Sequence, residues 1–140
     1  MEALIRWNHP SLGLLTPNMF IDGAEKTGLI IQMGYWALEQ ACKQIQIWEQ
    51  NDSNYFPLAV NLSAVQFEHK HLFSTLERLF GKYQINPNHL AIEITESTAM
   101  HHIDASIRCF NRLRQMGIKL AIDDFGTGHS SFLYLKNLPV

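Results

Sequence analysis

Three short apolar segments of the sequence each end in a residue that carries a side-chain oxygen. They read L-A-V-N, L-A-I-E and L-A-I-D, and their last residues are Asn61, Glu93 and Asp123. The spacing between these residues, 32 and then 30 positions, is that of one strand and one helix per step. Because the carboxyl ends of parallel strands lie on one side of a sheet, the repeat predicts that three strands deliver oxygen donors to the same place.

Glu2 and Asp124 extend this group of donors, since Glu2 opens a neighbouring strand and Asp124 follows Asp123 directly. Carboxylates so close together repel one another unless a cation lies between them, and hard oxygen ligands suit Mg²⁺ or Mn²⁺ better than zinc. Two such ions are a recurrent device for phosphodiester cleavage. The alternative is that each acid caps a helix or pairs with a lysine. Four donors in register, ahead of a glycine loop, favour metal binding.

Arg6 and Glu96 lie near these donors in the sequence. In a strand, Arg6 shares a face with Glu2, where its guanidinium is expected to hold a phosphate. The alternative is an ion pair between Arg6 and either Glu93 or Asp123. Glu96 lies beyond the end of its strand, so it is a poor metal ligand, and we expect it to anchor the glycine loop.

Hydrophobic spacing predicts the elements that position these donors. Strands are expected at residues 2–7, 58–62, 90–95 and 118–123, and helices at 33–49, 72–83, 103–116 and 130–135, with Thr16-Pro17 opening a shorter one. Alternating helices and nearly continuous apolar strands predict an α/β fold with a parallel sheet. An open doubly wound sheet and part of a (β/α)₈ barrel both fit. Functional residues at the carboxyl ends of the strands favour the barrel.

Composition bounds the class of protein. The 140 residues are 46% hydrophobic and 17% charged, which indicates one globular domain. The net charge of −2 and the scattered basic residues argue against a DNA or RNA polymer as partner. Cys42 and Cys109 fall in separate helical patterns and are expected to be buried thiols in a reducing compartment. No apolar run is long enough to span a bilayer, so a cytoplasmic domain is expected, although a longer parent protein could be membrane-tethered.

The seven histidines do not form a recognisable ligand pattern in the sequence. His69 and His71 lie at one helix start, and His101 and His102 lie just ahead of another. We therefore expect them on the surface or at helix caps rather than on a metal.

The sequence resembles the EAL domain, a bacterial family of cyclic di-GMP phosphodiesterases named for the tripeptide present here as Glu2-Ala3-Leu4. The resemblance runs almost from end to end of the chain. Its segments are E-A-L-I-R-W at residues 2–7, F-I-x-x-A-E-x-T-G-L-I at 20–30, G-x-W-x-L-x-x-A-C at 34–42, N-L-S at 61–63, E-I-T-E-S at 93–97 and D-D-F-G-T-G at 123–128. In this order and at this spacing they are highly specific.

This resemblance implies a (β/α)₈ barrel and metal-dependent hydrolysis of cyclic di-GMP to linear pGpG. It matches the ligands of a first ion to Glu2, Asn61, Glu93 and Asp123, and a ligand of a second ion to Asp124. Of these, Glu2, Asp123 and Asp124 are the candidate catalytic residues. It also matches Leu4 and Arg6 to positions that contact the dinucleotide, and Glu96 to the glutamate that steadies the loop after the fifth strand.

A barrel of this type needs about 250 residues, so residues 1–140 are expected to form a partial EAL domain. The expected part is about strands two to five, without the first strand and the C-terminal strands. Such a half-barrel would expose strand edges and an apolar interior face. We therefore expect the chain alone to be inactive, and either to self-associate or to belong to a longer protein. The complete domain is expected to be a homodimer, and the parent chain to carry cyclase or sensory domains.

Two other functions fit parts of the sequence. A non-catalytic module that binds cyclic di-GMP or a protein is disfavoured, because degenerate relatives usually lose the EAL glutamate or the paired aspartates that this chain keeps. A Mg²⁺-dependent α/β phosphotransferase is the third reading, and pGpG as the product would exclude it.

Overall fold

The computed structural model describes residues 1–52 and 57–124, and its centre is a parallel sheet of four strands. The strands lie side by side in the order β1 (Glu2–Ala3), β4 (Leu58–Asn61), β5 (Leu90–Thr95) and β6 (Lys119–Asp123). The long helices that connect them are α2 (Leu29–Gln50), α4 (Leu72–Tyr83) and α6 (Ile103–Gln115). The predicted α/β fold with a parallel sheet is confirmed.

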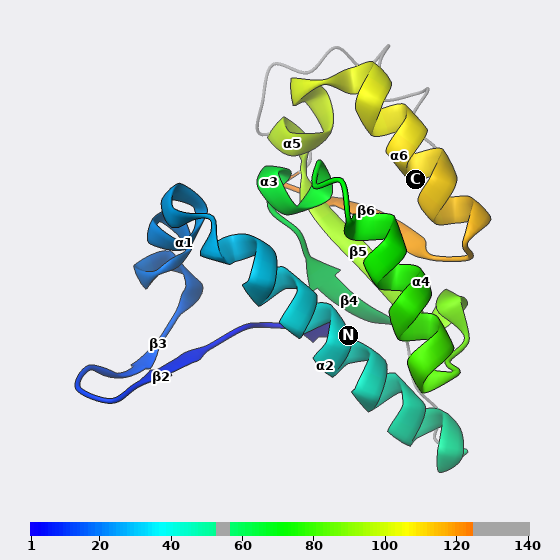
Figure 1. Cartoon of the computed structure of the whole chain (residues 1–140), viewed down its shortest axis with the longest axis horizontal. Helices are drawn as coiled ribbons and strands as arrows, with labels where there is room; N and C mark the ends of the chain where they lie inside the picture. The colour runs from blue at the N-terminus through cyan, green and yellow to red at the C-terminus, as the bar shows by residue number, and fades with distance from the viewer. Residues whose placement is uncertain (53–56, 125–140) are drawn as a thin grey trace.

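The order of the strands distinguishes the two architectures that the sequence left open. Each strand pairs with the next strand of the parallel sheet along the chain, with no reversal. Figure 1 shows α2, α4 and α6 side by side along one face of this sheet. A doubly wound sheet reverses its strand order and carries helices on both faces. The described residues therefore form part of the wall of a (β/α)₈-type barrel.

Shorter elements connect the sheet to these helices. They are η1 (Pro17–Met19), α1 (Ile21–Thr27), α3 (Ala64–Phe67), η2 (Pro87–His89) and α5 (Glu96–His101). α3 and α5 begin just beyond the carboxyl ends of β4 and β5, where the hydroxyls of Ser63 and Thr95 accept hydrogen bonds from backbone N–H groups of the first helical turn. The helix expected at residues 130–135 lies outside the described residues.

The register of the sheet differs in part from the one that the three repeated segments predict. Asn61 pairs with Glu93 across β4 and β5, as the sequence predicts. Asp123, however, pairs with Thr95, and Glu93 pairs with Ala121. The prediction that all the donors lie in register is therefore wrong for β6. A shift of two residues keeps side chains on the same face, because strand side chains alternate with a period of two.

The hydrophobic core lies between the sheet and its helices. Strand residues Val60, Leu90 and Ile92 pack in one cluster with helix residues that include Leu38 and Phe110, and all of these side chains are almost completely buried. Burial of a side chain of this size stabilises the fold by about 1.5–3 kcal/mol. The core therefore holds the strands that carry the donors.

The opposite face of the sheet carries smaller and more polar side chains than expected. By alternation this face carries Asn61 and Glu93, together with the alanines at positions 59, 91 and 121. The prediction of an apolar interior face is therefore only half right. Alanines line it, and carboxylates and an amide follow them at the carboxyl ends of the strands.

The segment after β1 does not continue as the strand expected at residues 2–7. β1 ends at Ala3, and the chain then forms an antiparallel hairpin of β2 (Trp7–His9) and β3 (Gly13–Leu15) that projects from the sheet (Figure 1). Gly13 has a φ of +74°, which favours glycine, at the return of this hairpin. The alternating sequence pattern is compatible with one strand over residues 2–7 and with the two shorter strands β1 and β2. Only tertiary pairing decides between these alternatives.

Gly34 makes room for a buried polar link between α2 and α3. The Gln66 side chain passes over it and donates from Nε2 to the carbonyl of Ile30 at 2.6 Å. Its Oε1 also accepts from the N–H of Ser63 at 2.8 Å. A Cβ at position 34 would lie 2.1 Å from Nε2 of Gln66.

Gly34→Ala should therefore destabilise the protein, even though alanine favours helices over glycine. The displaced amide leaves buried hydrogen bonds unmade, and we expect the free energy of unfolding to fall by about 1–3 kcal/mol. Urea unfolding followed by circular dichroism measures the change.

Gly81→Ala is the matched control, because nothing lies within 4 Å of a Cβ built at this position of α4. It should leave the free energy of unfolding unchanged or raise it by up to about 1 kcal/mol. In a Gln66→Ala background, Gly34→Ala should cease to destabilise. If Gly34→Ala lowers the free energy of unfolding equally with and without the Gln66 side chain, the steric explanation is wrong.

Candidate active site

Glu2 and Asn61 meet at the carboxyl end of the sheet. Asn61 is the last residue of β4, and its Nδ2 donates to Oε1 of Glu2 at 2.6 Å. The register brings them together, because Glu2 pairs with Ala59 and thus shares a face with Asn61. Both side chains are exposed to solvent. An amide and a carboxylate oxygen are thus accessible at one point.

Glu93 lies between two other acids. Partial burial raises the pKa of its carboxyl, and the negative charges of Glu2 and Asp123 raise it further, while the amino terminus opposes them weakly. The sheet thus brings Glu2 and Asp123 each close enough to Glu93 to repel its carboxylate. Their oxygens do not all lie within 4.8 Å of one another, so the group leaves space for water or an ion.

Asp123 and Asp124 form a sharp turn at the end of β6. The N–H of Asp124 donates to Oδ1 of Asp123 at 2.8 Å, and Asp124 has a φ of 58°. Aspartate enters this left-handed region more readily than most residues. The turn lets two consecutive aspartates lie at the same edge of the sheet.

Arg6 and Leu4 line an open groove beside these acids. The groove has a volume of about 1190 Å³, and its wall also includes Glu2, Asn61 and Glu93. The Arg6 guanidinium donates to the carbonyl of Ile5 at 2.8 Å. It forms no ion pair with another described residue, so the expected alternative of a salt bridge to Glu93 or Asp123 is not what the structure contains.

The donor set fits a hard divalent cation. Three carboxylates and one amide oxygen lie at one edge, and within residues 1–52 and 57–124 none of these acids pairs with a lysine, arginine or histidine. Mg²⁺ and Mn²⁺ take such oxygens together with water. A cation there would offset the repulsion that raises the pKa of Glu93.

Glu96 directly follows the last residue of β5 but, unlike Glu2 and Asn61, does not face solvent. Its side chain is 3% exposed, in the first turn of α5. The glycine loop that it was expected to anchor lies outside the described residues, so this role stays a prediction. The burial of Glu96 agrees with the prediction that it is a poor metal ligand.

The two cysteines are buried or partly buried, whereas none of the histidines among the described residues is buried. Cys42 and Cys109 are free thiols, and burial raises the pKa of each to about 12, as expected of packed rather than reactive cysteines. His71 and His102 occupy N-cap positions without a side-chain capping bond. Both side chains are exposed, so of the two expected roles, surface or helix cap, the surface position is the one that the structure shows. Sequence analysis also missed that His101 and His102 lie beside Glu68, a residue distant in the chain.

Known proteins match almost the whole chain. A family model described as the EAL domain matches residues 1–140. The bifunctional diguanylate cyclase/cyclic di-GMP phosphodiesterase MucR of Pseudomonas aeruginosa is 49% identical over 139 residues, which cover 99% of this chain and 20% of that protein. The cyclic di-GMP phosphodiesterase NbdA of the same organism is 38% identical over 140 residues, which cover 100% of this chain and 18% of that protein. The solved complex of the MucR phosphodiesterase with c-di-GMP has a TM-score of 0.95 at 49% identity, and the match covers 99% of this chain and 56% of that one.

A one-sided α/β wall with acids along its carboxyl edge defines a barrel-type domain suited to divalent cations. The chain belongs to the EAL domain family. Phosphodiesterases of this family generally depend on divalent metal ions. The chain spans about a fifth of the length of the two relatives named above. Within its described part, no helix is long and apolar enough to cross a bilayer.

The repulsion at Glu93 predicts an effect on stability. Because the folded state raises the pKa of this carboxyl, stability is lost as the pH rises through that pKa and the group ionises. Glu93→Gln removes the charge, so in metal-free buffer at pH 7 it should increase the free energy of unfolding, by less than about 1 kcal/mol for a partly exposed group. The gain should vanish below about pH 4, where glutamate is protonated.

Urea unfolding at the two pH values measures this difference. Glu77→Gln, which neutralises an exposed acid on α4, should have little effect at either pH. A loss of stability in Glu93→Gln at pH 7 would show instead that Glu93 pairs with a positive group.

Proposed function

We propose that this chain is part of a phosphodiesterase that hydrolyses cyclic di-GMP to linear pGpG in bacterial second-messenger signalling. The observation that carries the proposal is the cluster of oxygen donors at the carboxyl edge of the sheet, in which Glu2 and Asp123 repel Glu93 and Asn61 donates to Glu2. Family membership and the c-di-GMP bound in the MucR complex support the choice of substrate.

Each site residue has a proposed role. Glu2, Asn61, Glu93 and Asp123 hold a first Mg²⁺ or Mn²⁺ ion, and Asp124 holds a second in the complete domain. Bound ions of this kind would supply Lewis acidity and would lower the pKa of a bound water. Glu2, Asp123 and Asp124 are thus the catalytic ligands. Arg6 binds a phosphate, Leu4 contacts the dinucleotide, and Glu96 anchors the loop that follows Asp124.

Further strands are proposed to complete the barrel in the functional protein. The described sheet has β1 and β6 at its edges, and the match covers 56% of the MucR chain in its solved structure. We therefore expect residues 1–140 alone to be inactive, and the complete domain to form a homodimer within a protein that carries cyclase or sensory domains. We propose a cytoplasmic domain, which two free thiols support because they fit a reducing compartment.

Turnover by the longer protein that contains this segment tests the assignment. With Mg²⁺ or Mn²⁺ it should convert cyclic di-GMP to pGpG, measured by liquid chromatography. Glu2→Ala and Asp123→Ala should each lower kcat by on the order of 100-fold or more, the size expected when a group that stabilises transition-state charge is lost. Asp104→Asn, which neutralises an exposed acid on α6, is the matched control and should retain full activity.

Binding and turnover together separate the alternatives. No pGpG with either ion, in a protein that still binds cyclic di-GMP, would assign a non-catalytic binding module. Neither binding nor turnover would reject the substrate. Hydrolysis by residues 1–140 alone would overturn the proposed need for further strands.

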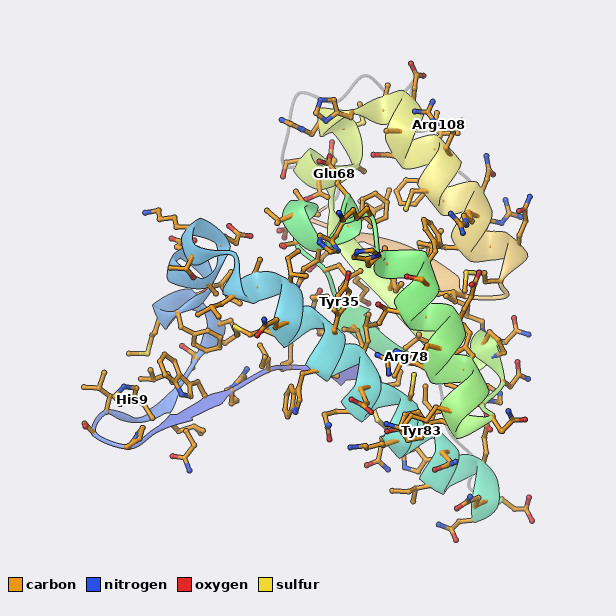
Figure 2. All side chains as sticks on the ribbon, viewed as in Figure 1. His9, Tyr35, Glu68, Arg78, Tyr83 and Arg108 are labelled. Atoms are coloured by element: carbon orange, nitrogen blue, oxygen red, sulfur yellow. The ribbon has the colours of Figure 1, made fainter. Side chains whose placement is uncertain are left out.

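Arg6 offers a test of phosphate binding. Arg6→Lys keeps the charge but loses the planar fork of donors, so KM for cyclic di-GMP should rise by about 10-fold, as expected for one charge-assisted hydrogen bond. Arg78→Lys, at an exposed position of α4 labelled in Figure 2, should leave KM unchanged. An unchanged KM in Arg6→Lys would contradict the proposed role of Arg6 in phosphate binding.

A further inference from the structure

Two histidines and a glutamate from different strand–helix units meet on the surface. Glu68 is the C-cap of α3, and His101 and His102 lie at the junction of α5 and α6. Figure 2 labels Glu68 next to α5. The two Nδ1 atoms are 2.9 Å apart, and Oε1 of Glu68 lies 3.4 Å from Nδ1 of His102 and 3.9 Å from Nδ1 of His101.

These separations lie near the edge lengths of a tetrahedral ligand shell. Zinc binds imidazole nitrogen and carboxylate oxygen at about 2.0–2.2 Å, so two neighbouring ligand atoms of a tetrahedron lie about 3.3–3.6 Å apart. The three measured distances scatter around this range, and the group lies within 4.8 Å overall. It is the only such group of three or more His, Cys, Asp or Glu residues in the part of the chain that the structure describes.

Hydrogen bonding explains the arrangement less completely. An Nδ1 atom of neutral histidine either donates one proton or accepts one. If His101 donates to His102, then Nδ1 of His102 presents no proton to Glu68. If His102 donates, its single proton is divided between His101 and Glu68. A cation at the centre instead satisfies all three lone pairs at once.

We propose that Glu68, His101 and His102 bind a zinc ion, with water as the fourth ligand. Two imidazoles and one carboxylate suit zinc, whereas the all-oxygen set at the edge of the sheet suits Mg²⁺ or Mn²⁺. The side chains are 42%, 67% and 61% exposed, respectively, which gives the ion and its water an open path. This site is separate from the proposed catalytic residues and does not depend on the proposed activity.

Zinc at this position would link two connections of the barrel wall. α3 follows β4 directly and α5 follows β5 directly, so the ion ties together segments that come after Asn61 and Glu93. Ligands from separate segments converge only in the folded chain. Zinc binding should therefore stabilise the fold.

Calorimetric titration of the 140-residue chain with zinc sulfate tests the proposal, using protein without a histidine tag in buffer without Mg²⁺. We expect one equivalent to bind and to raise the Tm. His101→Gln, His102→Gln and Glu68→Gln should each weaken binding by at least about 10-fold and remove most of the Tm increase. His71→Gln and Glu77→Gln, the same changes at exposed positions of α4 and its N-cap, should bind zinc as the unchanged protein does.

Glu93→Gln shows which site holds the ion. Binding that survives this substitution but not His101→Gln supports the proposal. Binding lost in Glu93→Gln and kept in His101→Gln would place zinc at the edge of the sheet and overturn it. Equal binding by all variants, or none by the unchanged chain, would also overturn it. Without zinc, His101→Gln, His102→Gln and Glu68→Gln should unfold at the same temperature as the unchanged chain, which excludes misfolding as the cause. Glu93→Gln should be slightly more stable, as predicted above for metal-free buffer.

Discussion

Repulsion among carboxylates at one edge of a parallel sheet is the constraint on which this structure depends. Partial burial and the neighbouring charges of Glu2 and Asp123 raise the pKa of Glu93. A chain free to relax would separate these groups. Here it cannot, because Glu93 is fixed to a strand whose alternate residues, Ile92 and Ile94, are buried in the core. The packed face therefore holds the acids together, and unfavourable electrostatics are stored where a cation can relieve them.

The connections after the strands complete this fixation. The helix caps at Ser63 and Thr95 begin α3 and α5 within two residues of Asn61 and Glu93, so each donor lies between a hydrogen-bonded ladder and a capped helix. Gln66 extends the link through its bond to the Ile30 carbonyl on α2. The backbone positions of these donors are therefore fixed before an ion binds, and their side chains need only move to reach it.

The sequence predicted which segments form strands better than it predicted the register of β6 or the end of β1. Repeated phrases that end in Asn61 and Glu93 gave the correct pairing of β4 with β5. They did not reveal the offset of β6, because a shift of two residues preserves the face on which Asp123 lies. The end of β1 at Ala3 was also missed, since local propensity cannot say whether a strand pairs with the sheet or with its own hairpin. The roles of the site residues remain predictions.

Ligand chemistry distinguishes the two cation sites that we propose. The edge of the sheet presents only oxygen, and its acids lie too far apart for a small closed shell without water. The cluster of Glu68, His101 and His102 presents two nitrogens and one oxygen that lie 2.9, 3.4 and 3.9 Å apart. Imidazole binds zinc-class ions far better than Mg²⁺, whereas hydrated Mg²⁺ prefers carboxylates. We therefore propose different preferred ions for the two groups of donors, because the strand ends gather only oxygen ligands while the helix termini add two imidazoles.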